Sequence, residues 1–260
     1  MKILRPLSYF IVAFIYIPMI VLMVFSFNQS RINAAWSGFT LDWYRSLLEN
    51  RFVLDALSNS MLVASATTVI ATIMGAFAAY GFYKYQFRWH SLWRGFIYAP
   101  LIIPELLMGL SLLILFSQFD IPLGKGTLII AHVTFSIPFV FLIIYDRLIE
   151  MGKELEEAAM DLGASPMQTF FLITLPVLMP SIFASILLVF TLSLDDFIIS
   201  FFVAGPNSTT LPIYIYGMIK RGISPEINAL ATLMIIFTIV FIAIAEWIRR
   251  KGSMKVNKTS

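Results

Sequence analysis

Three acidic residues interrupt long apolar stretches of the chain: Glu105, Asp195 and Asp196. A charged side chain at bilayer depth costs about 2.5–3.5 kcal/mol on insertion scales, so an acid there is a functional candidate. In a low-dielectric setting a carboxylate compensates a passing cation, binds a proton or sodium ion, or pairs with a basic or hydroxyl group on a neighbouring helix. The acids therefore indicate either a path for a charged solute or polar packing between helices.

The elements that position these acids are membrane helices. Of the 260 residues 59% are hydrophobic and only 13% are charged, which predicts an all-α, polytopic membrane protein. Because a bilayer core of about 30 Å needs about 20 apolar residues per helix, we expect six transmembrane helices within one domain over 1–260. Their expected ranges are 7–27, 60–83, 95–117, 127–145, 177–203 and 228–248. The first range is too long for a secretory signal, so we expect a retained helix.

The distribution of basic residues predicts the orientation of the chain. With the N-terminus inside, 12 of the 18 Lys and Arg residues face the cytoplasm, and both termini are cytoplasmic. The basic residues on the expected inner side are Lys2, Arg5, Lys84, Arg88, Arg94, Arg147, Lys153, Arg249, Arg250, Lys251, Lys255 and Lys258. The segment 146–176, between the fourth and fifth helices, is then cytoplasmic.

The three acids are expected at different depths. From a rise of about 1.5 Å per residue, Glu105 lies roughly 15 Å and Asp195 roughly 27 Å from the inner ends of their helices. Adjacent helical residues point about 100° apart, so Asp195 and Asp196 cannot both face one path, and the sequence does not choose between them. Pro100, Pro104 and Pro138 break helix regularity, either to expose carbonyls to a cavity or for packing alone.

The cytoplasmic segment 146–176 is predicted to form a helix, a tight turn and a second helix. Lys153 to Met160 favour a helix, Gly163 ends it, and Ser165-Pro166 start a short helix running to about Phe170. An amphipathic connector lying on lipid usually carries basic residues, whereas this segment is acidic. We therefore expect a protein partner, with Pro176 and Pro180 marking the bend back into the bilayer.

This segment carries a specific resemblance. The pattern Glu157-Ala158-Ala159, Gly163, Ile173 and Leu175-Pro176 resembles the coupling motif of integral membrane permease subunits of bacterial ABC importers of the six-helix type. The resemblance implies that the segment docks on an ATPase subunit and transmits nucleotide-driven closure. It also implies the ATPase-coupling residues Glu157, Ala158, Ala159 and Gly163.

Within that family the chain is most similar to permeases of spermidine/putrescine importers. The matching segments are Gly38-Phe39-Thr40 with Trp43-Tyr44, Asp161 to Ser165, Phe190 to Asp196, and Ser224 to Thr232. One departure is Pro104-Glu105, where the family pattern has Pro-Asp, which keeps the charge on a longer arm.

The resemblance implies a polyamine substrate, a chain of ammonium groups that needs compensating charge in a pore. The carboxylates that could compensate this charge are the predicted pathway residues Glu105, Asp195 and Asp196, and Tyr98, Phe197 and Tyr216 are candidates for cation–π contacts. The implied partners are a second six-helix permease subunit, a dimer of ATPase subunits and an extracytoplasmic polyamine-binding protein. The implied location is the bacterial inner membrane, in contact with lipid.

The sequence lacks the residues and motifs of several common catalytic and metal sites. The chain has no cysteine, no phosphate-binding loop and no zinc-protease motif, and its two histidines are His90 and His132. We therefore expect no catalytic or metal site, no nucleic-acid partner and no cofactor in this chain, with ATP and Mg used by the partner ATPase. The alternatives are an ABC permease for another small solute, an ion-gradient-driven secondary transporter and, with least support, an intramembrane enzyme.

Overall fold

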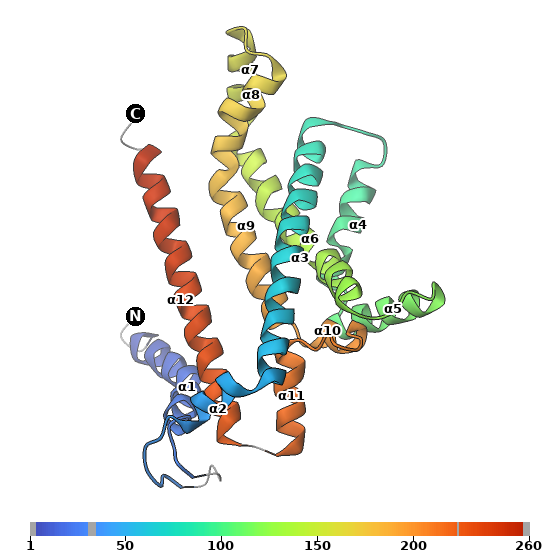
Figure 1. Cartoon of the computed structure of the whole chain (residues 1–260). Coiled ribbons are helices and arrows are strands. Elements are labelled where there is room, and N and C mark those ends of the chain that lie inside the picture. Colours follow the sequence, from blue (N-terminus) through green and yellow to red (C-terminus); the bar gives the residue numbers. More distant parts are fainter. Residues whose placement is uncertain (1–3, 31–34, 223, 257–260) are drawn as a thin grey trace. The chain divides into compact units, whose positions relative to one another are not determined.

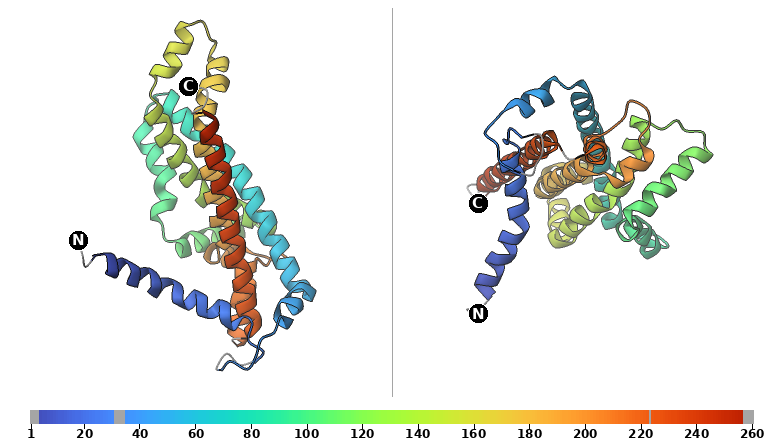
Figure 2. Two further views of the ribbon diagram at one scale, coloured as in Figure 1. Left: turned by 90° about the vertical axis from the view of Figure 1, so that its left-hand side faces the viewer. Right: turned by 90° about the horizontal axis from the view of Figure 1, so that it is seen from below.

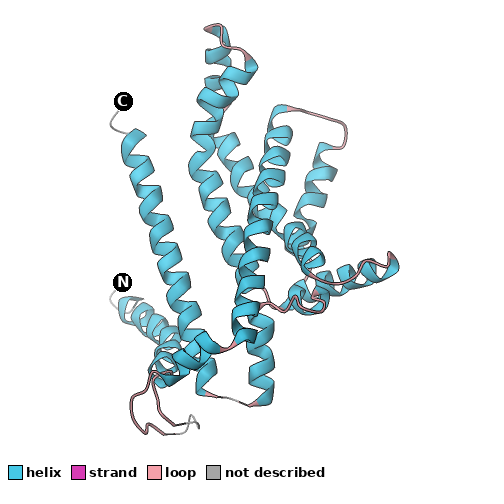
Figure 3. Ribbon diagram, in the orientation of Figure 1, coloured by secondary structure: helices cyan, strands magenta, loops and turns pink. Residues whose placement is uncertain are grey.

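The computed structural model describes residues 4–30, 35–222 and 224–256, and these residues form helices and loops without β-strands (Figure 3). The expected all-α class is therefore confirmed. The helices, labelled in Figure 1, are α1 (Leu4–Phe25), α2 (Asp42–Glu49), α3 (Arg51–Lys84), α4 (His90–Ile102), α5 (Glu105–Gln118), α6 (Lys125–Met151), α7 (Glu154–Asp161), α8 (Pro166–Thr169), the π-helical turn η1 (Phe170–Thr174), α9 (Leu175–Asp195), α10 (Ile198–Val203), α11 (Leu211–Arg221) and α12 (Pro225–Val256).

Four described helical segments are long and apolar enough to cross a membrane. They are Leu7–Phe25, Arg51–Lys84, Lys125–Met151 and Pro166–Asp195. The pair α4 and α5 adds a fifth span if the two bent helices count as one. The chain is thus polytopic, and the expected number of six transmembrane helices stays a prediction.

The stretch 95–117, expected to be one helix, is instead broken into α4 and α5. The two helices meet at an angle of 107°, with extended backbone at Ile103 (ψ 130°) and Pro104 (ψ 134°). Proline disfavours the helical conformation in the residue before it and has no amide hydrogen to donate, so Pro104 accounts for the break. The bend makes Glu105 the first residue of α5 rather than a mid-helix residue.

The stretch 177–203, also expected to be one helix, is interrupted at Asp196. Asp196 is extended (ψ 123°), and its carboxylate accepts hydrogen bonds from the amides of Ile199 (3.4 Å) and Ser200 (2.7 Å). Local bonds of this kind offer the backbone an alternative to continuing a helix. The acid at this position therefore ends α9 and starts the short helix α10.

The second helix of the segment 146–176, α8, ends at Thr169 with Phe170 as its C-cap, close to the predicted end, but the chain stays helical beyond it. It continues through η1 into α9 as one helical run, Pro166–Asp195. Pro176 cannot donate an amide hydrogen bond, and the turn before it widens so that the Leu175 amide bonds to the Phe170 carbonyl. Pro176 and Pro180 are accommodated within the run, which connects the cytoplasmic segment directly to a membrane helix.

The chain divides into two compact units. One contains residues 1–57 and 211–243, and the other contains residues 58–210 and 244–260. In the second unit α6 packs along α9 and also contacts α4. Close approach of α3 to α6 depends on Gly75, because a Cβ there would lie 2.6 Å from the Val140 Cβ. The expectation of one domain over 1–260 stays a prediction.

Figure 1 and the left view of Figure 2 show where the expected partner-binding segment lies in the second unit. Helix α7 and the turn into α8, both yellow, project beyond the ends of α3 and α4. The segment therefore extends past the neighbouring helices of its own unit.

Candidate functional site

The turn between α7 and α8 is built from the local signals in its sequence. Gly163 has φ +91°, a conformation that residues with a Cβ rarely adopt. Ser165 caps α8 by accepting the Gln168 amide (3.4 Å), while the Gln168 side chain accepts the Ser165 amide (2.8 Å). The predicted helix end at Gly163 and helix start at Ser165-Pro166 are confirmed.

The four residues predicted to contact an ATPase differ in exposure. Glu157, Ala158 and Gly163 are exposed, whereas Ala159 is buried. Ala159 therefore packs inside the segment, and the other three lie on its surface. All four remain predicted contact residues.

Exposed apolar side chains surround this turn and were not identified from the sequence. They are Leu155, Met160, Leu162 and Met167, and Leu162 is 90% exposed. A cluster of exposed apolar groups on a projecting element is typical of a protein-binding surface. The sequence signal that could have found Leu162 is its position immediately before Gly163, at the tip of the turn.

A buried ion pair attaches the segment to α3. The Lys84 Nζ lies 2.6 Å from Glu156 Oε2, and the Thr174 hydroxyl donates to Glu156 Oε1 at 2.7 Å. The Glu156 side chain is 3% exposed. Tyr83 adds a second attachment, because its hydroxyl donates to the Gly152 carbonyl at 2.7 Å. We call Lys84, Glu156 and Thr174 the coupling latch.

The two adjacent glutamates of α7 have different surroundings. The motif residue Glu157 is exposed and can contact a partner. Glu156, one position earlier, is buried and bonded to Lys84 and Thr174. The latch joins three elements, the end of α3, helix α7 and the turn η1 that leads into α9. The latch therefore connects α7 to the end of α3 and to the helical run that contains α9.

The three membrane acids lie in different surroundings. Glu105 and Asp195 are exposed, at the start of α5 and at the end of α9. The Asp196 side chain is 7% exposed and lies 3.3 Å from His132 Nε2. Asp195 is therefore exposed in this chain, while the Asp196 carboxylate already has internal partners.

His132 is the centre of a buried polar cluster. Its side chain is fully buried, with Nδ1 2.7 Å from the Ser193 hydroxyl and Nε2 2.9 Å from the Ser200 hydroxyl. Together with Asp196 these groups fix α6 to the break between α9 and α10. The contact of His132 with Asp196 was not predicted from the sequence.

The three aromatic residues predicted along the pathway also lie in different surroundings. Tyr98 packs edge-on against Phe141, with ring centroids 5.7 Å apart, and Phe197 packs against Phe201 at 5.6 Å. Tyr216 belongs to the other compact unit, where Lys220 lies 4.8 Å from its ring centroid. A cationic side chain therefore already lies over one face of the Tyr216 ring.

Helix α10 packs closely against α5, the helix that begins with Glu105. A Cβ at Gly109 of α5 would lie 3.3 Å from the Ile199 Cα and 2.8 Å from the Phe202 ring. Two predicted pathway acids thus stand at the starts of a closely packed pair: Glu105 begins α5, and Asp196 immediately precedes the first turn of α10.

These features define a class. Several membrane-length helices, acids at two helix breaks and a projecting helical turn bonded to the membrane helices describe a polytopic membrane protein. The chain belongs to the family described as "Binding-protein-dependent transport system inner membrane component", which matches residues 68–252. The resemblance to permease subunits of ABC importers is therefore confirmed, and the chain is a multi-pass inner-membrane protein.

Curated relatives extend the similarity over most of the chain. The "Spermidine/putrescine transport system permease protein PotC" of Escherichia coli (strain K12) is 41% identical over 240 residues, covering 92% of this chain and 91% of that protein. The "Putrescine transport system permease protein PotI" of the same organism is 43% identical over 229 residues, covering 85% of this chain and 82% of that protein.

A solved structure shares the fold. A bacterial ABC transporter involved in import of the acidic polysaccharide alginate matches with a TM-score of 0.76 at 17% identity, covering 96% of this chain and 94% of that one. A structure of a bacterial alginate ABC transporter with a periplasmic protein bound to an alginate pentasaccharide matches with a TM-score of 0.72 at 18% identity, over 99% of this chain and 94% of that one.

Proposed function

We propose that this chain is a permease subunit of an ATP-driven ABC importer for polyamines. The observation that carries the proposal is the 41% identity to a spermidine/putrescine permease over 92% of this chain. Exposed carboxylates at Glu105 and Asp195 support the same cargo, because a chain of ammonium groups needs compensating charge at membrane depth.

The chain would cross the inner membrane six times with both termini in the cytoplasm. The bent pair α4 and α5 and helix α12 would complete the set begun by the four membrane-length segments. The excess of basic residues on one side supports this orientation. The segment 146–176 would then face the cytoplasm.

The projecting turn between α7 and α8 would dock on an ATPase subunit. Glu157, Ala158 and Gly163 would contact the partner directly, and exposed Leu162 would insert an apolar anchor. The coupling latch would transmit the partner's movement to α3 and α9. ATP and Mg would be bound by the ATPase, and this chain would carry no catalytic site.

The translocation pathway would form between this chain and a second permease subunit. Asp195 is the stronger candidate of the adjacent acids for contact with substrate, because the Asp196 carboxylate is engaged by His132 and by amides of α10. A periplasmic binding protein would deliver the polyamine, as the solved complex with a periplasmic protein suggests by analogy of fold.

Uptake of labelled spermidine and putrescine into proteoliposomes tests the proposal. The vesicles would contain this chain, its second permease and the ATPase dimer, with ATP inside and the binding protein outside. Uptake that depends on both ATP and the binding protein supports the proposal. Accumulation driven by an imposed ion gradient without ATP would overturn it.

A further inference from the structure

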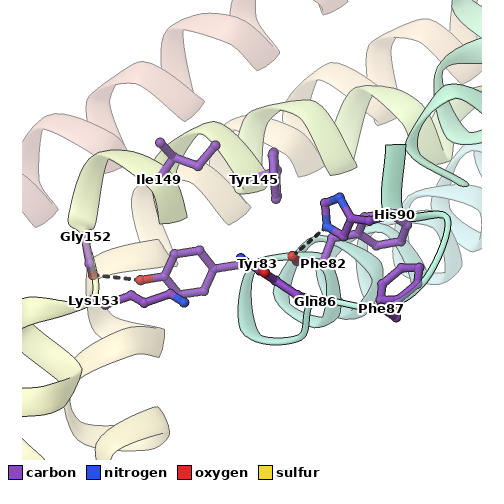
Figure 4. Close-up of a pocket in the computed structure, with 9 residues that line it drawn as sticks. All are labelled: Phe82, Tyr83, Gln86, Phe87, His90, Tyr145, Ile149, Gly152 and Lys153. Atoms are coloured by element: carbon purple, nitrogen blue, oxygen red, sulfur yellow. Dashed lines mark hydrogen bonds between the residues drawn. The ribbon is translucent and has the colours of Figure 1, made fainter. Parts of the chain in front are cut away.

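A pocket of about 500 Å³ lies beside the coupling latch (Figure 4). Its lining comes from the end of α3 and the following turn, the start of α4, the end of α6, and the link from α6 to α7. The lining residues are Phe82, Tyr83, Gln86, Phe87, His90, Tyr145, Ile149, Gly152 and Lys153. A volume of about 300–1,000 Å³ is usual for a small-molecule site.

The pocket combines an apolar wall with groups that bind anions. The apolar wall is formed by Phe82, Phe87 and Ile149. None of the lining residues has a carboxylate side chain. Lys153 Nζ and the Gln86 amide have no hydrogen bond or ion pair within the part of the chain that the structure describes. Because His90 Nε2 faces the Phe82 carbonyl at 3.1 Å, it must donate there. Among these lining residues Lys153 carries a positive charge and none carries a negative one, which favours an anion over a cation, while the Glu154 carboxylate lies just outside the lining beside Gly152.

The position of the pocket favours a lipid. It lies where α3 ends and a short basic loop begins, with Lys84, Arg88 and Arg94 nearby in sequence, at the expected inner surface of the membrane. Basic pockets between transmembrane helices on the cytoplasmic side bind the head groups of anionic lipids. An apolar wall beside a free ammonium suits a phosphate that carries acyl chains.

We propose that this pocket binds the phosphate head group of an anionic phospholipid and thereby holds the coupling segment in position. The proposal rests on the proposed function for its effect on transport, but lipid binding itself does not. Gly152, whose φ is +73°, and Lys153 form the link between α6 and α7. A head group bound between Lys153 and the α3–α4 turn would restrain that link alongside the bond from Tyr83 to Gly152.

Lipid retention by the assembled transporter tests the proposal. The complex would be released from nanodiscs containing equal phosphatidylglycerol and phosphatidylcholine, and bound lipid would be counted by native mass spectrometry. We expect selective retention of phosphatidylglycerol, and a fall of fivefold or more in the Lys153→Ala variant. The matched control is Arg88→Ala, which removes a charge from the same basic region without touching the pocket and should retain the lipid.

A second variant separates loss of the site from loss of folding. Ile149→Trp fills the pocket while leaving every charge in place, and it should also reduce retention in a complex that elutes normally on size exclusion. Equal retention of the two lipids, or retention unchanged in both Lys153→Ala and Ile149→Trp, would overturn the proposal.

Two further measurements are needed. One identifies the source of the bound phosphate, and the other tests whether the bound lipid affects transport. Displacement of the lipid by millimolar inorganic phosphate or AMP would overturn the lipid assignment and identify a soluble phosphate as the ligand. ATP hydrolysis per polyamine transported should rise at least twofold in phosphatidylcholine alone. An unchanged ratio would overturn the restraining role, while a complex that binds phosphatidylglycerol but moves no polyamine would count against the proposed function only.

Discussion

The Lys84 ammonium and the Glu156 carboxylate are 2.6 Å apart, and they join the end of a membrane helix to the helix expected to meet the ATPase. The two residues are 72 positions apart in the sequence. A salt bridge with one side chain 3% exposed is costly to leave half-formed, because removing one partner leaves a buried charge. The coupling latch therefore makes the position of α7 depend on that of α3.

Removing the latch lysine should uncouple the transporter. Lys84→Met leaves Glu156 buried without its cation, and α7 should loosen. The loss of stability should fall below the roughly 3–5 kcal/mol typical of fully buried pairs, because the Lys84 side chain is 31% exposed. Hydrogen exchange of the α7 amides should accelerate, and ATP hydrolysis per polyamine transported should rise several-fold.

Two variants control this prediction. Lys84→Arg keeps the charge and should restore coupling, whereas the double exchange Lys84→Glu with Glu156→Lys should recover part of it. Coupling that is normal in Lys84→Met would remove the latch from the mechanism.

A side chain at Gly163 should disturb the turn that presents α7. An L-residue in the left-handed region costs roughly 1–2 kcal/mol, and Gly163 has φ +91° with open space around it. Gly163→Val should uncouple ATP hydrolysis from uptake while membrane insertion stays normal. Gly163→Asn is the matched control, because asparagine tolerates this conformation, and it should retain most activity. Equal activity of the two variants would show that the backbone conformation is not required.

The exposed leucine at the tip should anchor the ATPase. Leu162 is 90% exposed, and its burial against a partner should contribute about 1.5–3 kcal/mol. We expect Leu162→Asp to weaken association of the ATPase with the solubilised permease pair at least tenfold, as measured by pull-down titration. Leu162→Met, which keeps the volume and apolar character, should bind normally. Undiminished binding of the aspartate variant would place the contact elsewhere.

Substitutions of the two adjacent acids, Asp195 and Asp196, should have different effects. Asp195 is exposed, so Asp195→Asn should reduce polyamine uptake while the complex assembles normally. Asp196→Ala removes the caps on Ile199 and Ser200 and the partner of His132, so it should lower thermal stability. The double variant with asparagine at both positions should abolish uptake. If Asp195→Asn transports at the normal rate, the exposed acid has no role in the pathway.

Local signals predicted much of the segment 146–176 because they act over a few residues. Gly163, Ser165 and Pro166 each specify a backbone conformation or a cap, and all three act as expected. The latch and the contact of His132 with Asp196 could not be predicted, since each joins residues far apart in the sequence. The helix break at Asp196 was also not predicted, because the length of the apolar stretch contains no information about a carboxylate that caps the next helix.

Delivery of a polyamine on one side of this permease should stimulate ATP hydrolysis on the other. The direct measurement is ATPase activity of this chain reconstituted in lipid with its second permease, ATPase and binding protein, on addition of spermidine, putrescine or an amino acid. We expect stimulation by a polyamine and none by the amino acid. Stimulation by the amino acid alone would contradict the assigned cargo, and failure of the partners to assemble with this chain would contradict its assignment as a subunit of such an importer.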